Sequence, residues 1–213
     1  MDLASCIDHT ILKSQATLED INKLCQEAKE YSFAAVCVNP CFVRSAKEML
    51  KGTQVKVATV VGFPLGANTT TTKVYETQEA ASQGADEIDM VMAVGWFKSG
   101  NFEAVIRDIR EVVRAAGDKP VKVIIETCYL NPEEIKQAAS LAVEAGAAYV
   151  KTSTGFGTRG AVVEDIKLIK EAVGERAKIK ASGGIKTKEE ALKMIKAGAA
   201  RIGTSAGVAI INS

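Results

Sequence analysis

The sequence predicts an α/β fold, a single-domain (β/α)8 TIM barrel that spans residues 1–213. Three observations lead to this prediction. Short runs rich in β-branched residues alternate along the whole chain with stretches of 3.6-residue apolar spacing. Three of those stretches end near Gly84, Gly146 and Gly198, each placed to end a helix just before a strand. Such alternation requires parallel strands with right-handed crossovers, and eight units fit a compact barrel.

Eight runs have the length and composition of buried strands. They are residues 6–9, 33–38, 55–62, 87–91, 121–126, 149–152, 178–181 and 201–203. Seven helices are expected between them, and a short eighth helix after the last strand. The first helix is predicted from one apolar face, formed by Leu18, Ile21, Leu24, Cys25 and Ala28. Val105, Ile109, Val112 and Val113 show the same spacing in a later helix.

Capping residues mark two of the helix starts. Thr17 precedes the acidic pair Glu19 and Asp20. Asn131 precedes Pro132, and proline is favoured at the first position of a helix. Both starts are therefore specified locally.

An open, doubly wound sheet is the alternative fold. It would suit a nucleotide-binding protein, whose phosphate loop has a recognisable glycine pattern. No G-x-G-x-x-G follows the first predicted strand, and no G-x-x-x-x-G-K-[ST] is present. The barrel is therefore the better prediction.

The composition favours a small molecule as partner. Hydrophobic residues make up 47%, charged residues 25% and aromatic residues 5%, and the formal net charge is +1. Interspersed charges of both signs predict neither a nucleic-acid surface nor a membrane surface. No apolar run approaches the roughly 18 residues of a membrane span. The N-terminal residues lack the pattern of a secretory signal, so a cytoplasmic location is expected.

The sequence predicts no metal site and no bound cofactor. Five cysteines are widely scattered and the chain has one histidine, His9. They form neither a disulfide framework nor a zinc-binding spacing. Cys37 and Cys41 come nearest to a pair, and we expect reduced thiols there.

The C-terminal ends of the predicted strands carry chemically capable side chains, and catalytic residues of (β/α)8 barrels lie at these ends. Read in order, the ends are Asp8, Cys37, Gly62, Asp89, Glu126, Lys151, Lys180 and Gly203. Lys151 and Lys180 stand on consecutive strands, each in an apolar run that breaks into small residues. The pair is therefore the first candidate for a reactive centre.

Two buried lysines this close would alter each other's pKa. At about 4 Å and an effective dielectric near 20, two ammonium groups repel by roughly 4 kcal/mol. That repulsion would bring the pKa of one lysine from about 10.4 to about 7.5. Such a lysine is a nucleophile at neutral pH. The alternative is structural: each lysine could reach solvent or form an ion pair with Asp89 or Glu126.

A nucleophilic amine without a metal or nucleotide motif favours Schiff-base chemistry on a carbonyl substrate. The protonated imine would act as the electron sink for making or breaking a carbon–carbon bond. Asp89 is the candidate carboxylate for the proton transfers. Its alternative role is to cap the helix that follows its strand.

Small-residue turns after the last two strands predict a phosphate site. Residues 182–185 and 203–206 enter helices, and in barrels these two loops commonly bind anions through backbone N–H groups. The alternative is that the glycines serve the turns alone. Residues 154–160 form a loop expected to close on the ligand, and Arg159 in this loop is a further candidate for the phosphate.

Several motifs resemble those of the deoxyribose-phosphate aldolase family. They are YVKTSTGFG, KASGGI, DEIDMV, VVGFPLGANTTTTK and IDHTILK, and the similarity runs from end to end. It implies a class I aldolase of the (β/α)8 fold that reversibly cleaves 2-deoxy-D-ribose 5-phosphate to D-glyceraldehyde 3-phosphate and acetaldehyde, in deoxyribose phosphate breakdown. The substrates would be a phosphosugar and aldehydes. Barrels of this size commonly pair through their outer helices, so a homo-oligomer, a dimer or a tetramer, is expected.

The resemblance also assigns roles to residues. Lys151 would form the Schiff base, Lys180 would lower its pKa, and Asp89 would transfer protons with the help of water. Asp8 matches an aspartate near the amine pair, and Cys37 matches a cysteine that lines the pocket. The remaining residues expected to bind substrate are Thr154, Gly155, Gly183, Gly184, Gly203 and Ser205.

Two features depart from the family pattern. Some members end in a flexible tail whose terminal tyrosine assists proton exchange, whereas this sequence ends at Asn212 and Ser213. We therefore expect that step to depend on Asp89 and water or to be slower, unless the sequence given lacks the tail. Some members carry a lysine where Phe156 stands, so a weaker preference for phosphate is expected.

Two other functions remain as alternatives. One is a different class I barrel enzyme that acts on another sugar or keto acid. The other is a phosphosugar isomerase, or a phosphate-ligand binder, in which the lysines act only as cations. Borohydride reduction separates that second alternative from the aldolases, because only an imine is reduced onto the protein.

Overall fold

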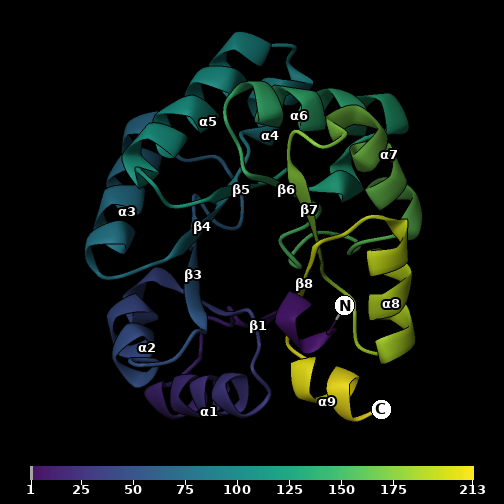
Figure 1. The fold of residues 1–213 in the computed structure, drawn as a ribbon. Coiled ribbons are helices and arrows are strands. Elements are labelled where there is room, and N and C mark those ends of the chain that lie inside the picture. The colour runs from purple at the N-terminus through teal and green to yellow at the C-terminus, as the bar shows by residue number, and fades with distance from the viewer. Residues whose placement is uncertain (1) are drawn as a thin grey trace.

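The computed structural model describes residues 2–213 and contains a closed barrel of parallel strands in the order β1 to β8. The strands are β1 Ile7–Ile11, β2 Ala35–Val38, β3 Lys56–Val61, β4 Glu87–Val91, β5 Val121–Ile124, β6 Tyr149–Lys151, β7 Lys178–Ser182 and β8 Arg201–Thr204. Figure 1 shows the helices surrounding the barrel in chain order, with the two termini near each other. The predicted single-domain (β/α)8 fold is confirmed.

The described residues contain one helix more than the sequence predicted. The helices are α1 Leu18–Glu30, α2 Val43–Met49, α3 Thr70–Ser82, α4 Val94–Lys98, α5 Phe102–Ala116, α6 Pro132–Glu144, α7 Val163–Val173, α8 Lys188–Ala197 and α9 Gly207–Asn212. Short 3₁₀ helices lie at Ala4–Cys6, Pro40–Phe42 and Thr127–Tyr129. The unexpected element is α4, whose five residues are too few to display a helical period.

Local capping explains where the helices begin. Thr17 and Asn131 are the N-cap residues of α1 and α6, and each forms a capping box with the third residue of its helix. Both predicted starts are confirmed. The predicted apolar face of α1 is buried except at Leu18, which is 57% exposed. It occupies the first helical position, where the side chain does not reach the barrel.

The barrel interior divides into an apolar part and a charged part. Ala35 and Cys37 of β2 pack with Ala58 and Val60 of β3. The other strands direct charged side chains inward, and these are Asp8, Glu87, Asp89, Lys122, Lys151, Lys180 and Arg201. A larger apolar core lies between the barrel and the surrounding helices. The site therefore lies inside the barrel rather than on its outer surface.

The parallel register places several of these charges on neighbouring strands. Asp89 of β4 is the register partner of Lys122 of β5. Lys151 of β6 is the partner of Lys180 of β7, which is in turn the partner of Arg201 of β8. Because alternate residues of a strand face the same side, these partners share the barrel interior.

A buried ion pair outside the barrel supports the end of β4. Lys73 of α3 and Asp108 of α5 are fully buried, and Lys73 Nζ lies 2.6 Å from Asp108 Oδ2. Lys73 Nζ also donates to the carbonyl oxygen of Val91 at 3.0 Å, and Thr70 Oγ1 donates to Asp108 Oδ1 at 2.8 Å. The pair therefore connects two helices to the strand that carries Asp89.

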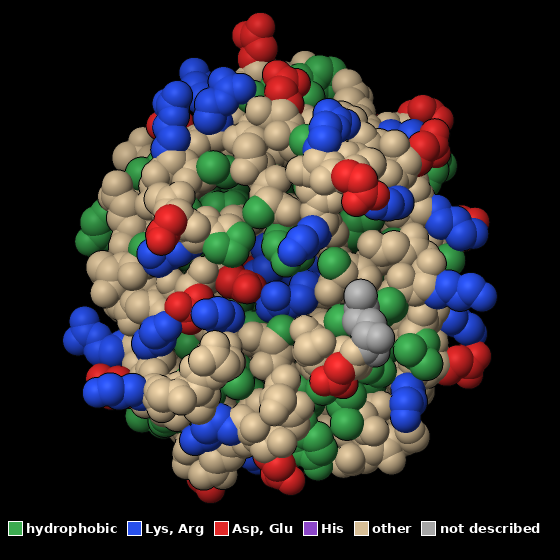
Figure 2. Space-filling view, in the orientation of Figure 1, with side chains coloured by type: hydrophobic (Ala, Val, Ile, Leu, Met, Phe, Trp, Pro, Cys, Tyr) green, Lys and Arg blue, Asp and Glu red, His purple; other side chains and the backbone are tan. Residues whose placement is uncertain are grey.

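Charges of both signs are spread over the surface. Figure 2 shows Lys and Arg side chains interspersed with Asp and Glu around the rim of one face, with a further group at its centre. This distribution matches the formal net charge of +1. Among residues 2–213, no helix combines the length and the apolar character needed to cross a membrane.

Candidate active site

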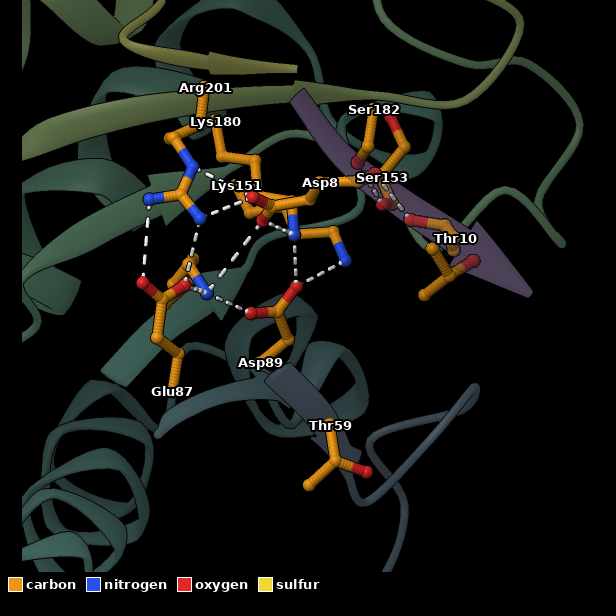
Figure 3. Close-up of polar contacts among 12 residues, drawn as sticks. Asp8, Thr10, Thr59, Glu87, Asp89, Lys151, Ser153, Lys180, Ser182 and Arg201 are labelled. Atoms are coloured by element: carbon orange, nitrogen blue, oxygen red, sulfur yellow. Dashed lines mark hydrogen bonds and ion pairs between the residues drawn. The ribbon is translucent and has the colours of Figure 1, made fainter. Parts of the chain in front are cut away.

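Inside the barrel, charged side chains from five strands form a closed ring of alternating sign, which we call the charge ring. The members, in order around the ring, are Arg201, Asp8, Lys180, Asp89, Lys122 and Glu87. Figure 3 labels all of them except Lys122. Lys180 Nζ lies 2.6 Å from Asp8 Oδ2 and 2.7 Å from Asp89 Oδ2. Lys180 thus joins β1 to β4 across the barrel.

The other two cations complete the charge ring. Lys122 Nζ lies 2.7 Å from Asp89 Oδ1 and 2.6 Å from Glu87 Oε2. Arg201 donates from Nε to Asp8 Oδ1 at 2.7 Å and from Nη2 to Glu87 Oε2 at 3.1 Å, and its Nη2 also contacts Asp8 Oδ1. Every member therefore touches two neighbours of opposite charge.

Lys151 is attached to the charge ring but is not a member of it. Its Nζ donates to Asp89 Oδ2 at 2.7 Å, the same oxygen that Lys180 contacts. Among the described residues, Asp89 is the one carboxylate with which Lys151 forms an ion pair. Its side chain is only 3% exposed.

The balance of charges in the ring explains why Lys151 loses its proton more easily than the other cations. The ring holds three cations and three carboxylates, and is neutral by itself. A protonated Lys151 adds a fourth cation with no carboxylate of its own. In a buried site an uncompensated charge is costly, and the group tends to lose its proton instead. The arrangement therefore supplies a neutral amine.

The pKa directions follow from these contacts. Burial lowers the pKa of Lys151; Asp89 opposes this and Lys180 adds to it, so that the pKa falls below its ordinary value. Burial also acts to lower the pKa of Lys180, but Asp8 and Asp89 outweigh it and hold that pKa above its ordinary value. The two lysines therefore separate into a neutral amine and a stable cation.

The two aspartates of the ring, Asp8 and Asp89, stay ionised. Burial acts to raise the pKa of Asp8, but Lys180, Arg201 and Lys122 outweigh it and lower that pKa to about 2. Burial opposes ionisation of Asp89 as well, and Lys122, Lys151 and Lys180 together hold its pKa well below the usual range. Each carboxylate thus keeps its neighbouring amines in place.

The sequence argument named repulsion by Lys180 as the cause of the lowered pKa of Lys151. In the structure burial is the larger cause, and Lys180 acts in the same direction. The reason is that Asp89 Oδ2 stands between the two amines and contacts both. Its negative charge offsets much of their repulsion.

An open cavity of ≈ 710 Å³ adjoins Lys151. It is lined by most of the residues predicted to bind substrate, namely Thr154, Gly155, Gly183, Gly184, Gly203 and Ser205. Asp89 and Lys180 are buried and are not part of its lining. Lys151 is therefore the member of the predicted catalytic set that a ligand in this cavity meets first.

Two predicted substrate-binding residues have other surroundings. Asp8 is fully buried and contacts Lys180 and Arg201. Cys37 is also fully buried, packs among the small apolar residues of the barrel, and has a pKa raised by burial. Neither lines the cavity, and contact of either with substrate stays a prediction.

The predicted phosphate loops offer open backbone donors. Within residues 2–213, the N–H groups of Gly183, Gly184 and Ser205 donate to no protein acceptor. The two residues that precede α8 offer no free N–H group, because Glu190 Oε2 accepts from the N–H groups of Lys186 and Thr187 at 2.8 and 3.0 Å. The loops rather than this helix end therefore present the free N–H groups.

Gly203 has a packing role as well as a place in the cavity. A Cβ atom at this position would lie 3.0 Å from Lys180 Cε and 3.0 Å from Ser182 Cβ. Its neighbours would have to move to accept any side chain. Glycine at 203 therefore leaves the space through which Lys180 reaches the charge ring.

The loop after β6 is fastened by Glu126. The Glu126 carboxylate accepts from the Thr154 N–H at 3.2 Å and from the Thr154 hydroxyl, and Thr154 Oγ1 accepts from the Phe156 N–H at 3.0 Å. Arg159 donates to Asp165 Oδ2 of α7 at 2.5 Å and is not part of the cavity lining. The contacts of Arg159 therefore give no support to its expected role at the phosphate.

Several charged residues of the site were not predicted. The sequence does contain a sign of Lys122, because this residue stands in a Val-Lys-Val run that resembles the run around Lys151. Glu87 shares the direction of Asp89 along β4. No feature of the sequence pointed to Arg201, because it is the first residue of its strand and not the last. Lys13 and Lys186 also line the cavity and bring positive charge to it.

Comparisons with known proteins agree with this site. The model of the DeoC/LacD family aldolases matches residues 3–212. A deoxyribose-phosphate aldolase of Thermoanaerobacter sp. (strain X514) is 59% identical, over 99% of this chain and 96% of the relative. The corresponding aldolase of Clostridium botulinum (strain Loch Maree / Type A3) is 61% identical, over 99% of this chain and all of the relative.

A solved structure gives the same result. The deoxyribose phosphate aldolase from Aeropyrum pernix, described as a unique tetrameric structure, matches with a TM-score of 0.92 and 34% identity. The match covers 99% of this chain and 90% of that one. With a family match over nearly all its residues and relatives at about 60% identity, this chain belongs to the DeoC/LacD family of aldolases.

Proposed function

We propose that this protein is a class I aldolase that reversibly cleaves 2-deoxy-D-ribose 5-phosphate to D-glyceraldehyde 3-phosphate and acetaldehyde, in the breakdown of deoxyribose phosphate. The observation that carries the proposal is the amine of Lys151. It is buried, has a lowered pKa, and lies beside an open cavity. The names of the relatives support the choice of substrate.

Lys151 is the nucleophile in this proposal. Its neutral amine attacks the aldehyde carbon of the open-chain sugar, and loss of water from the carbinolamine gives a protonated imine. Asp89, acting through water, then takes the proton of the C3 hydroxyl, and the carbon–carbon bond between C2 and C3 breaks. Its electron pair moves toward the imine nitrogen and leaves an enamine on Lys151. D-glyceraldehyde 3-phosphate leaves, protonation of the enamine at C2 restores the imine, and hydrolysis releases acetaldehyde and free Lys151.

Asp89 transfers protons together with water. Its Oδ2 contacts the amines of both Lys151 and Lys180, so a proton leaving one nitrogen has an acceptor at 2.7 Å. Because the pKa of Asp89 is held well below its usual range, it keeps a proton only briefly. Lys180 stays charged and helps Lys151 to remain neutral.

The phosphate of the sugar lies against the loops after β7 and β8. Gly183, Gly184 and Ser205, whose N–H groups donate to no acceptor within residues 2–213, line the cavity, and Lys13 and Lys186 add positive charge. Backbone N–H groups combined with cations are a common way to bind phosphate. Thr154 and Gly155 border the same cavity from the loop after β6.

The protein is proposed to act as a homo-oligomer built from a single domain over residues 1–213. The tetramer described for the Aeropyrum pernix relative supports this assembly. Light scattering on the purified chain distinguishes a dimer or a tetramer from a monomer.

The direct test of the proposed function is product analysis by NMR. Wild-type protein incubated with 2-deoxy-D-ribose 5-phosphate should yield equal amounts of acetaldehyde and D-glyceraldehyde 3-phosphate. Lys151→Ala should lose this activity, whereas Lys178→Ala, on the exposed start of β7, should keep it. Formation of an isomeric phosphosugar, or no turnover by folded wild-type protein, would contradict the proposal.

A further inference from the structure

Arg201 closes the charge ring from β8, two strands away from Lys151 on β6. It is the first residue of β8, and 12% of its side chain is exposed. It does not line the cavity, and none of its contacts reaches Lys151 directly. Any effect of Arg201 on the reaction must therefore pass through the ring.

The guanidinium fixes two carboxylates at once. Arg201 Nε lies 2.7 Å from Asp8 Oδ1, which is an oxygen that Lys180 does not use. On its other side, Arg201 Nη2 lies 3.1 Å from Glu87 Oε2, and Nη1 lies 3.4 Å from Glu87 Oε1. Such a fork holds carboxylates in a fixed orientation, which a lysine does not do.

The orientation of Asp8 matters because its second oxygen holds Lys180. With Oδ1 occupied by Arg201, Oδ2 faces Lys180 Nζ at 2.6 Å. Lys180 in turn is held against Asp89, beside Lys151. A chain of three contacts therefore leads from Arg201 to the carboxylate that binds the reactive amine.

We propose that Arg201 is a positioning residue for the reaction: through Asp8 and Glu87 it completes the charge ring and so leaves Lys151 as the one amine without a carboxylate of its own. This inference rests on the proposed function of Lys151 and extends it to a residue of β8, two strands away from Lys151. Glu87 is the carboxylate that pairs with Arg201 in the same charge ring.

The charge count predicts opposite effects for these two residues. Arg201→Gln removes a cation, so that a protonated Lys151 is balanced by the remaining carboxylates and keeps its proton to higher pH. Glu87→Gln removes a carboxylate, so that a protonated Lys151 is opposed by a larger excess of cations and loses its proton at lower pH. Nearby charges commonly shift a pKa by about one unit or more.

Other charged and titratable groups surround these residues and stay in place in both variants. Lys151 faces Asp89, Lys180 and Cys37. Arg201 faces Tyr149 in addition to its two carboxylates. Neither substitution removes a group that touches Lys151. A shift in the titration of Lys151 therefore results from the changed charge balance of the ring and not from a lost contact.

The experiment measures the titration of Lys151 without relying on catalysis. Folded wild-type, Arg201→Gln, Glu87→Gln and Arg201→Lys proteins are labelled with traces of acetic anhydride across a pH series. Peptide mass spectrometry then gives the acetylation rate of Lys151 at each pH. Arg176→Gln is the matched control, because in the described part of the chain the Arg176 side chain donates to the backbone carbonyls of Val173 and Ala172 and to no carboxylate.

The predicted result is a titration moved up by about one pH unit in Arg201→Gln and moved down in Glu87→Gln. In Arg201→Lys, Lys151 should titrate near its wild-type pH, because the positive charge is kept. The same variant should show a lower kcat, because a lysine cannot hold two carboxylates as the forked guanidinium does. Arg176→Gln should match wild type. A further readout is the acid limb of kcat/KM, which should move in the same directions.

If Arg201 had only a structural role, the Lys151 titrations of the two ring variants would not shift in opposite directions. Both ring variants would then lose stability and activity with the Lys151 titration unchanged, or with shifts of the same sign, and either result overturns the inference. Failure of the proposed function is distinguishable, because wild-type protein would then show no cleavage of the phosphosugar while the acetylation titrations could still be measured.

Discussion

Lys151 and Lys180 are register partners on β6 and β7, and their amines contact the same oxygen of one carboxylate. The similarity of their positions hides a difference in charge balance. Lys180 has a second carboxylate, whereas Lys151 shares the one carboxylate that it contacts among residues 2–213. This difference separates a permanent cation from a neutral amine, and most of the predictions below depend on it.

The activity should depend on pH through Lys151. The neutral amine is the reactive form, so the rate falls as pH decreases through the pKa of Lys151. Because that pKa is lowered from 10.5, the acid limb of kcat/KM should lie below the pKa of an ordinary lysine. Cleavage rates of 2-deoxy-D-ribose 5-phosphate across a pH series check this. An acid limb of kcat/KM at the pKa of an ordinary lysine would contradict the lowered pKa of Lys151.

Lys186 should contribute to phosphate affinity. It lines the cavity beside the loop after β7, and Lys186→Gln removes a positive charge there. We expect KM for the phosphosugar to rise by about 3- to 10-fold, since a partly exposed charge contact contributes on the order of 1 kcal/mol. Lys188→Gln is the control, because Lys188 Nζ donates to the carbonyl oxygen of Ser213 and lies outside the lining. Equal KM values for the two variants would argue against phosphate binding at this loop.

Lys73 should matter for stability rather than for chemistry. Lys73→Met leaves the fully buried Asp108 without its cation, which should cost about 3–5 kcal/mol of unfolding free energy. Urea unfolding measures the loss. Lys193→Met breaks an exposed pair with Glu189 and should cost less than about 1 kcal/mol. The double variant Lys73→Met, Asp108→Leu should recover much of the loss, and no recovery would mean that the charge itself is not the cause.

Asp8 should stabilise the fold above pH 4 and lose this effect in acid. Its pKa is lowered from 3.8 to about 2, so the ionised form is favoured by folding. The contribution is present above 3.8, corresponds to about 2 kcal/mol, and disappears as pH falls toward 2. Asp8→Asn should therefore flatten the fall in unfolding free energy over this range. Asp118→Asn, at a side chain 95% exposed, should leave the pH dependence unchanged.

The fold and the central residues could be predicted from sequence because both follow local rules. The alternation of periods specifies the barrel, and the ends of β4, β6 and β7 bring Asp89, Lys151 and Lys180 together. The charge ring could not be predicted in the same way. Its contacts cross the barrel, and they depend on strand tilt and side-chain length rather than on spacing along the chain.

Arg201 and α4 show two other limits of sequence reasoning. Arg201 begins its strand, so a search of strand ends passes over it, although its long side chain reaches the charge ring. The five residues of α4 show no helical period and follow β4 directly. The contacts of Arg201 are with Asp8 and Glu87, which are distant from it in the sequence.

The most direct test of the central claim is to trap the imine. Protein is incubated with acetaldehyde and sodium borohydride, and the intact mass and the modified peptide are determined by mass spectrometry. The account predicts one added ethyl group, about 28 Da, on Lys151, which Lys151→Ala abolishes and Lys178→Ala retains. An unmodified Lys151 in folded, wild-type protein would contradict the Schiff-base mechanism and leave the two lysines as cations only.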